Sequence, residues 1–207
     1  MWGPRSREIL AAITTDDVSN EAFPYLVVRK LTVNHVEVLA VRISYVGELG
    51  WELYCPADHG ARFWDIVWEA GQEHGALAAG TTAQDSLRLE KGYRLWGADI
   101  HTEYNPLQAG LGFGVDLDKG DFIGRAALVD ARSAGVRNRL RCMTLDDPSR
   151  IVMGKEPIWL DGKIAGYVTS AGIGYSIGQS IALGYLPVAG SKLGGRVEIE
   201  YFGERLP

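Results

Sequence analysis

The sequence has 207 residues, of which 46% are apolar, and it carries a formal net charge of −5 at pH 7. The apolar fraction supports a substantial core and argues against an intrinsically disordered chain. The acidic balance, with both signs scattered along the chain, argues against a nucleic-acid-binding surface, which is typically a basic patch.

The two cysteines, Cys55 and Cys142, form no C-x-x-C motif, and the four histidines form no close pair. Neither a disulfide framework nor a zinc site is therefore expected. The N-terminal residues lack the apolar stretch of a signal peptide. No run reaches the roughly 18 apolar residues of a membrane span. We expect a protein of the cytoplasm or, in a eukaryote, of the mitochondrial matrix, with no membrane partner.

The first third of the chain predicts a helix followed by two strands. Apolar residues recur at helical spacing between Pro4 and Thr14. Residues 36–43 alternate as in a strand, and a second strand is expected from Trp51 to Cys55. The segment 46–50 between them contains two glycines and is expected to form the turn of a hairpin.

A longer helix is expected over residues 59–74, with Asp58 as its N-cap. Phe63 lies on the face expected to pack against a sheet, and Trp64 and Trp68 lie beside it. We interpret this aromatic stripe as core packing rather than as a cofactor-binding surface.

The segment Thr82–Asp85 resembles a capping box and predicts a helix that continues to Lys91. On this helix Asp85, Arg88 and Glu90 have the spacing of solvated surface charges. A shorter helix is expected over residues 124–134.

The predicted secondary structure changes from helices to short strands after residue 134. Short strands with frequent glycines are expected at residues 140–145, 164–170, 180–185 and 196–201. The predicted fold is therefore α+β: an antiparallel sheet with helices in residues 1–134, followed by a small all-β barrel-like domain in residues 135–207.

Two motifs resemble known catalytic or binding loops but lack their context. Residues 174–178 match G-x-S-x-G, yet a strand follows and no histidine occurs after His101, so a β-turn is expected. The glycine-rich run 110–115 lacks the spacing of a phosphate-binding loop.

The hairpin between residues 42 and 54 concentrates groups suited to a flat polar heterocycle. A carboxylate can accept two parallel N–H bonds from an amino-pyrimidinone edge, and aromatic rings can stack on its faces. An amphipathic hairpin with solvent-facing glutamates is the alternative. The candidate side chains are Tyr45, Glu48, Trp51, Glu52 and Tyr54.

Several segments, taken in order, resemble the aminomethyltransferase superfamily. Residues 42–52 resemble its R-x-(S/G)-Y-x-G-E-x-G-(Y/W/F)-E signature, and residues 85–100 resemble its next block. Residues 105–112, 122–125, 166–170 and 180–185 resemble later blocks. The superfamily includes the glycine cleavage T-protein and the tetrahydrofolate-binding regions of dimethylglycine and sarcosine dehydrogenases. Residues 93–97 resemble the dehydrogenase branch more.

The resemblance implies a set of cofactor-binding residues. Glu52 corresponds to the glutamate that holds the pterin ring, and Tyr45 contributes in the dehydrogenase-like branch. Gln84 stands where many T-proteins carry an arginine that meets the folate. Arg88 and Trp96 complete the set, with a mainly supporting role. The catalytic residue is not identified, because the family's aspartate belongs to a part that precedes the matching blocks.

The implied activity is transfer of an aminomethyl or methyl unit to tetrahydrofolate, in glycine cleavage or in sarcosine or dimethylglycine catabolism. The implied partners are a small amine or methyl donor and a flavoprotein dehydrogenase domain or subunit. The chain resembles a C-terminal fragment of such an enzyme, so we expect weak folate binding and no turnover by itself. The alternative is a non-catalytic folate-binding or flavoprotein-docking module. Residues 91–98 lack the cysteine of the branch that serves iron–sulfur protein maturation.

Overall fold

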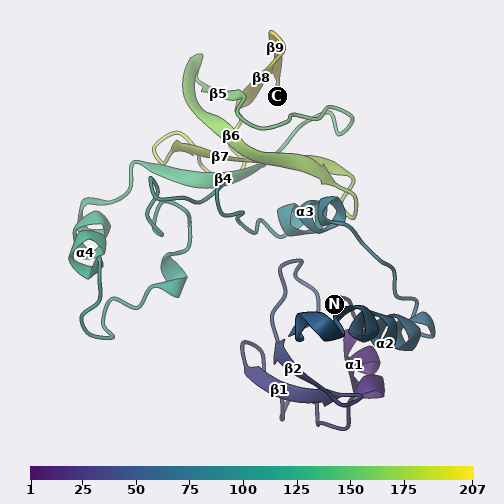
Figure 1. The fold of residues 1–207 in the computed structure, drawn as a ribbon. Helices are drawn as coiled ribbons and strands as arrows, with labels where there is room; N and C mark the ends of the chain where they lie inside the picture. Colours follow the sequence, from purple (N-terminus) through teal and green to yellow (C-terminus); the bar gives the residue numbers. More distant parts are fainter. The chain divides into compact units, whose positions relative to one another are not determined.

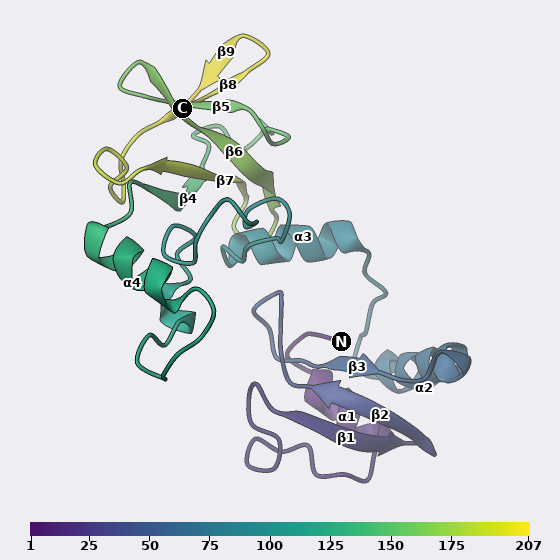
Figure 2. The same cartoon turned by 60° about the vertical axis from the view of Figure 1, so that its left-hand side comes forward.

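The computed structural model describes all residues from Met1 to Pro207, and the chain forms two compact units, Met1–Gln84 and Asp85–Pro207. Figures 1 and 2 show both units, each of which combines helices with an antiparallel sheet. This confirms the predicted fold class. None of the helices has both the length and the apolar character of a membrane-spanning segment.

The first unit is built on a three-stranded sheet of order β1-β2-β3, with β1 at Val28–Val33, β2 at Val36–Val41 and β3 at Glu52–Tyr54. Both pairings are antiparallel. The predicted β2–β3 hairpin is confirmed, although its connection covers residues 42–51. Strand β1 was not predicted from the sequence; it is joined to β2 through Asn34 and His35, both at positive φ.

Two helices cover the buried face of this sheet, α1 at Ser6–Ile13 and α2 at Gly60–Gln72. Leu10 of α1 belongs to one core cluster with Leu31 and Trp51, and Phe63 of α2 belongs to a second with Val38. Strand β2 alternates because Val36, Val38 and Ala40 point into these cores. The expected helices are therefore present.

Two details of the α2 prediction are wrong. Asp58 does not cap α2: it lies in a 3₁₀ turn, Ala57–His59, and His59 occupies the N-cap position. The tryptophans are not core residues, since Trp64 is 57% exposed and stacks on Trp68 with ring centroids 6.1 Å apart. The sheet-facing positions of α2 are filled by Phe63 together with Ile66 and Val67, and not by the tryptophans.

Helix α3, Thr81–Glu90, begins one residue before the predicted capping box, so Thr82 lies inside its first turn and is not the N-cap. The rest of the second unit contains α4 at Arg125–Ala134, as predicted, and a short 3₁₀ turn at Gly112–Gly114. The glycine-rich run 110–115 thus forms this turn.

A six-stranded antiparallel sheet of order β4-β7-β6-β5-β8-β9 dominates the second unit. Its strands are β4 (Asn138–Thr144), β5 (Pro157–Leu160), β6 (Lys163–Gly174), β7 (Gln179–Pro187), β8 (Glu198–Tyr201) and β9 (Glu204–Leu206). β6 is long enough to pair with β7 through one half and with β5 through the other, and both pairings contain a register shift. The sheet curls, and the Asp146 N–H donates to the Pro207 carbonyl oxygen at 2.9 Å.

The inner face of this curled sheet carries one apolar core that includes Ile158, Val168, Leu186 and Ile199. The predicted strands are present, whereas β5 and β9 were not predicted. Residues 175–178 form the turn between β6 and β7, and Gly174 ends β6. The structure thus agrees with the expectation that the G-x-S-x-G match is a turn.

Gly166 is required by the close approach of β6 to β7. A Cβ at this position would lie 1.9 Å from the Tyr185 carbonyl oxygen, whereas a Cβ at Gly60 in α2 would meet no atom within 4 Å. We expect Gly166→Ala to lower the free energy of unfolding by about 1–3 kcal/mol. Gly60→Ala should leave it unchanged or slightly raised. Chemical denaturation of both variants checks this, and equal effects would show that the close approach is not limiting.

Candidate functional site

The connection between β2 and β3 is shaped by a serine and two glycines. Ser44 Oγ accepts the N–H groups of Val46 at 3.3 Å and Glu48 at 3.1 Å, which closes the turn. Gly47 has a φ of +76°, which favours glycine. Gly50 approaches the N-terminal segment so closely that a Cβ there would lie 2.3 Å from the Met1 carbonyl oxygen. These constraints fix the path of the chain into β3.

Trp51 and Glu52, although adjacent, face opposite sides of the sheet. Trp51 is fully buried and packs against Phe23 with ring centroids 6.0 Å apart. Trp51 therefore cannot offer a free face to a ligand, and the structure removes it from the candidate stacking residues. Glu52 is half-buried on the outer face, and its Oε2 accepts the Tyr54 hydroxyl at 2.5 Å. That hydrogen bond raises the pKa of Tyr54.

Apolar side chains lie next to Glu52 on the outer face of the sheet. The pairing register aligns Glu52 with Val41 and Val28 in one cross-strand row, and Tyr54 with Leu39 and Lys30 in the next. Val28 is 53% exposed, Leu39 42% and Tyr54 54%. A carboxylate is thus presented at the edge of an exposed apolar surface that includes one tyrosine ring.

The other residues singled out from the sequence lie in separate segments. Tyr45 is half-buried in the β2–β3 connection, and Glu48 is exposed on the same connection. Gln84 is half-buried on α3. Trp96 is 71% exposed on the loop that follows α3. The structure brings Glu52 and Tyr54 into direct contact, and sequence reasoning had placed Tyr54 only among the general candidates.

Arg88 is not the solvated charge expected from its position on the helix, because it is 1% exposed. Its Nε donates to Asp85 at 2.7 Å, its Nη1 to Asp99 Oδ2 at 2.8 Å and to the Tyr93 carbonyl oxygen at 3.0 Å, and its Nη2 to Ser170 Oγ at 3.0 Å. The guanidinium therefore joins α3, the following loop and β6.

Asp99, the buried partner of Arg88, has no exposed surface and accepts bonds through both carboxylate oxygens. Oδ2 also accepts the Leu95 N–H at 2.9 Å, and Oδ1 accepts the Thr169 hydroxyl. The Asp99 carbonyl oxygen accepts the Tyr185 hydroxyl at 2.9 Å. These bonds fix both ends of the loop segment that carries Trp96.

A cluster of tyrosines extends this network. The rings of Tyr104 and Tyr185 stack with centroids 3.6 Å apart, and the hydroxyls of Tyr104 and Tyr167 lie 2.9 Å apart. Burial, reinforced by the charge of Asp99, raises the pKa of Tyr185 to about 12. Burial and the hydrogen bond with Tyr167 also raise the pKa of Tyr104. The phenols are held neutral in the folded unit.

Comparison with known proteins identifies the family. Residues 1–119 match the family model described as the GCVT N-terminal domain, and residues 138–207 match that of the glycine cleavage T-protein C-terminal barrel domain. The chain belongs to the glycine cleavage T-protein family.

Relatives within this family include both dehydrogenases and aminomethyltransferases. Human mitochondrial dimethylglycine dehydrogenase is 42% identical over 206 residues, which is 99% of this chain but 24% of that protein. Human mitochondrial sarcosine dehydrogenase is 42% identical over 200 residues, 96% of this chain and 21% of that protein. An aminomethyltransferase of Symbiobacterium thermophilum is 38% identical and is matched over all of this chain and 55% of its own length.

A solved structure supports the fold assignment. The glycine cleavage system aminomethyltransferase T of Bartonella henselae superimposes with a TM-score of 0.76 at 27% identity, over 82% of this chain and 47% of that one. The chain thus spans about half the length of the aminomethyltransferases it matches and about a quarter of the length of the dehydrogenases.

The Arg88–Asp99 ion pair should dominate the stability of the second unit. Arg88→Met should lower the free energy of unfolding by about 3–5 kcal/mol, because it leaves the Asp99 carboxylate buried without its cation. The double variant Arg88→Met, Asp99→Leu should lose less than the sum of the two single variants. A double-mutant cycle measured by urea denaturation checks this. Additive losses would show that the two side chains do not depend on each other.

The tyrosine cluster predicts a loss of stability in alkaline solution. A phenol in the unfolded chain ionises near pH 10, whereas Tyr185 has a pKa of about 12 in the folded protein. Its contribution is therefore fully present below pH ~10 and lost as the pH rises to about 12. Urea denaturation across this range should show a smaller decline for Tyr185→Phe than for wild type. Tyr25→Phe, which changes an exposed ring, should decline like wild type. An equally steep decline for Tyr185→Phe would refute the contribution.

Proposed function

We propose that this chain forms the pterin-holding part of an enzyme that transfers an aminomethyl or methyl unit to tetrahydrofolate. Its membership of the glycine cleavage T-protein family supports a role in folate-related one-carbon transfer. The dehydrogenase relatives favour sarcosine or dimethylglycine catabolism over glycine cleavage as the setting.

The observation that carries the proposal is the position of Glu52. Its carboxylate stands at the edge of an exposed apolar sheet face, and Tyr54 bonds only its Oε2. Each carboxylate oxygen can accept more than one hydrogen bond. Both oxygens can therefore still receive the paired N–H groups of an amino-pyrimidinone edge, while the apolar face covers one side of the ring.

The other residues belong to the proposed cofactor-binding set through the family resemblance. Tyr45 and Gln84 are half-buried, and Trp96 is exposed. Arg88 is enclosed, so it acts as a positioning residue by holding the loop that carries Trp96.

The proposed setting includes a flavoprotein. The two human dehydrogenase relatives are mitochondrial, and this chain spans 24% of one and 21% of the other. We propose that a small amine serves as one-carbon donor and that a flavoprotein dehydrogenase domain or subunit works with this chain, in the mitochondrial matrix or the cytoplasm. The boundary between the folate-binding part and the barrel is proposed to lie at residues 132–135, between the two matched segments.

Replacement of Glu52 tests the proposed function. Glu52→Gln replaces an oxygen acceptor with an N–H₂ donor that opposes the donors of the pterin. We therefore expect about a tenfold or larger loss of tetrahydrofolate affinity. Titration calorimetry under anaerobic conditions gives the dissociation constant, and a thermal melt checks that the fold is unchanged.

Glu48→Gln is the matched control, because Glu48 is an exposed glutamate on the same connection. Its affinity for tetrahydrofolate should equal that of wild type. If Glu52→Gln binds as tightly as wild type, the pterin-holding role of Glu52 is wrong.

A further inference from the structure

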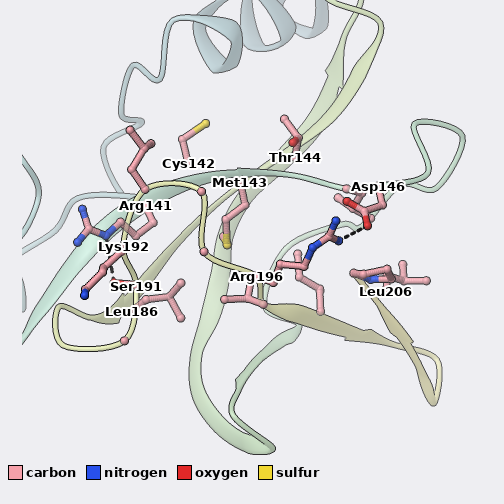
Figure 3. A pocket seen from close by; sticks show the side chains of 18 of the residues that line it. Arg141, Cys142, Met143, Thr144, Asp146, Leu186, Ser191, Lys192, Arg196 and Leu206 are labelled. Carbon is pink, nitrogen blue, oxygen red and sulfur yellow. Dashed lines mark hydrogen bonds and ion pairs between the residues drawn. The ribbon is translucent and has the colours of Figure 1, made fainter.

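A cavity of about 520 Å³ opens along β4 in the second unit. Every residue from Leu140 to Asp146 lines it, and the opposite wall is the segment 190–197 (Figure 3). Successive residues of a strand point to opposite faces. A cavity lined by all of them therefore runs along the edge of β4 rather than over one face.

This edge of β4 has main-chain groups without partners. β4 pairs with β7 alone, and it is the outermost strand of the sheet. On the side away from β7, the Leu140 N–H donates to the Gln108 carbonyl oxygen at 2.9 Å, and the Asp146 N–H donates to Pro207 at 2.9 Å.

Main-chain groups of an antiparallel strand alternate between its two edges. The N–H and C=O groups of Cys142 and Thr144 must therefore point to the same open edge as the N–H groups of Leu140 and Asp146. They make no hydrogen bond there. The edge is thus bridged at both ends and open over two hydrogen-bonding residues in between.

Charge is distributed unevenly along the cavity. At one end, Arg141 donates to Ser191 Oγ at 3.1 Å and has no carboxylate partner, and Lys192 is exposed beside it. At the other end, Arg196 is neutralised by an ion pair with Asp146. The first end therefore attracts an anion, and the second does not.

The side chains of β4 give the cavity an inner and an outer side. Met143 points into the cavity, whereas Cys142 and Thr144 point away from it (Figure 3). Arg141 shares the inner face with Met143 by the two-residue period of the strand. Leu186 and Leu206 add apolar surface. A bound strand would thus meet an apolar site opposite Met143 and a cationic site opposite Arg141.

We propose that this cavity binds an extended peptide segment of a partner protein, which adds an antiparallel strand to β4. The segment carries an apolar side chain opposite Met143 and an acidic side chain two residues later, opposite Arg141. Strand addition supplies affinity through main-chain hydrogen bonds and specificity through alternate side chains. A second copy of this chain is a poor occupant, because pairing of Cys142 with Thr144 of the other copy would put Leu145, and not a carboxylate, opposite Arg141.

The peptide acetyl-Thr-Val-Thr-Glu-amide is a direct probe of this proposal. Its two threonines would lie opposite Thr144 and Cys142, its valine opposite Met143 and its glutamate opposite Arg141. NMR titration of the 15N-labelled chain should shift the amide signals of Cys142 and Thr144 more than those of the rest of β4. A peptide with both threonine nitrogens methylated should not bind, since it loses the main-chain donors but keeps its charge.

Matched arginine variants test whether the charge of Arg141 contributes to peptide binding. Arg141→Gln should weaken binding of the peptide about tenfold. Arg139→Gln, an arginine on the same strand outside the cavity, should leave binding unchanged. Cys142→Pro should abolish binding without disturbing the pairing with β7, because it removes an N–H that points to the open edge. A thermal melt checks the fold of each variant.

The proposal is wrong if the folded wild-type chain does not bind the peptide, or if it binds the methylated peptide equally well. It is also wrong if the two arginine variants have equal effects, or if the peptide binds without shifting the signals of Cys142 and Thr144. Free glutamate or acetate bound as tightly as the peptide would assign the cavity to small carboxylates instead. The valine-to-aspartate peptide should bind more weakly, because Met143 and Leu206 offer it no polar partner.

Discussion

The buried ion pair between Arg88 and Asp99 organises the part of the second unit around α3. A buried charge is tolerated only when partners replace its lost hydration. Four hydrogen bonds of Arg88 reach the helix, the loop after it and β6, and Asp99 in turn receives bonds from Leu95 and Thr169. Loop and barrel therefore cannot separate locally without exposing an uncompensated charge. An exposed ring such as Trp96 is held by a rigid support for this reason.

The β2–β3 hairpin uses a different device to present Glu52. Its neighbour Trp51 is fully buried against Phe23, so the strand cannot rotate without emptying the core. The alternation of strand residues then obliges Glu52 to face outward, and Tyr54 on the same face restrains its carboxylate. Fixed carboxylate oxygens recognise a donor pair with less loss of conformational entropy than a freely rotating glutamate would. In the proposed function, Trp51 thus contributes stability and the adjacent Glu52 contributes recognition.

Local patterns in the sequence were sufficient for the family, the fold class and most of the elements. These patterns failed where a hydrogen-bond partner is distant in the sequence, or where turn residues other than glycine adopt a positive φ. Arg88 has the spacing of a surface charge, and its burial depends on Ser170, which lies 82 residues away in the chain. β1 was missed because the turn before β2 is formed by Asn34 and His35 at positive φ, without the glycine that normally indicates such a turn.

The aromatic stripe of α2 failed for a related reason. Helical periodicity identifies a face but not its width, and on this narrow three-stranded sheet Phe63, Ile66 and Val67 fill the contact without the tryptophans. Trp64 and Trp68 were left to stack on each other at the border of a second, apolar cavity of about 690 Å³. The number of strands beneath a helix decides how much of its apolar face becomes core, and that number depends on strand pairings that no single segment encodes.

The two edges of the barrel sheet illustrate how strand pairing and charge act together. β9 is a short edge strand, which limits pairing with other chains by its length. β4 is longer, and hydrogen bonds of Leu140 and Asp146 bridge its edge at both ends, so that only Cys142 and Thr144 stay open between them. In the proposal above, the unmatched charge of Arg141 then favours an acidic strand over a neutral one. The bridges that limit pairing at this edge would therefore leave room for one short acidic segment.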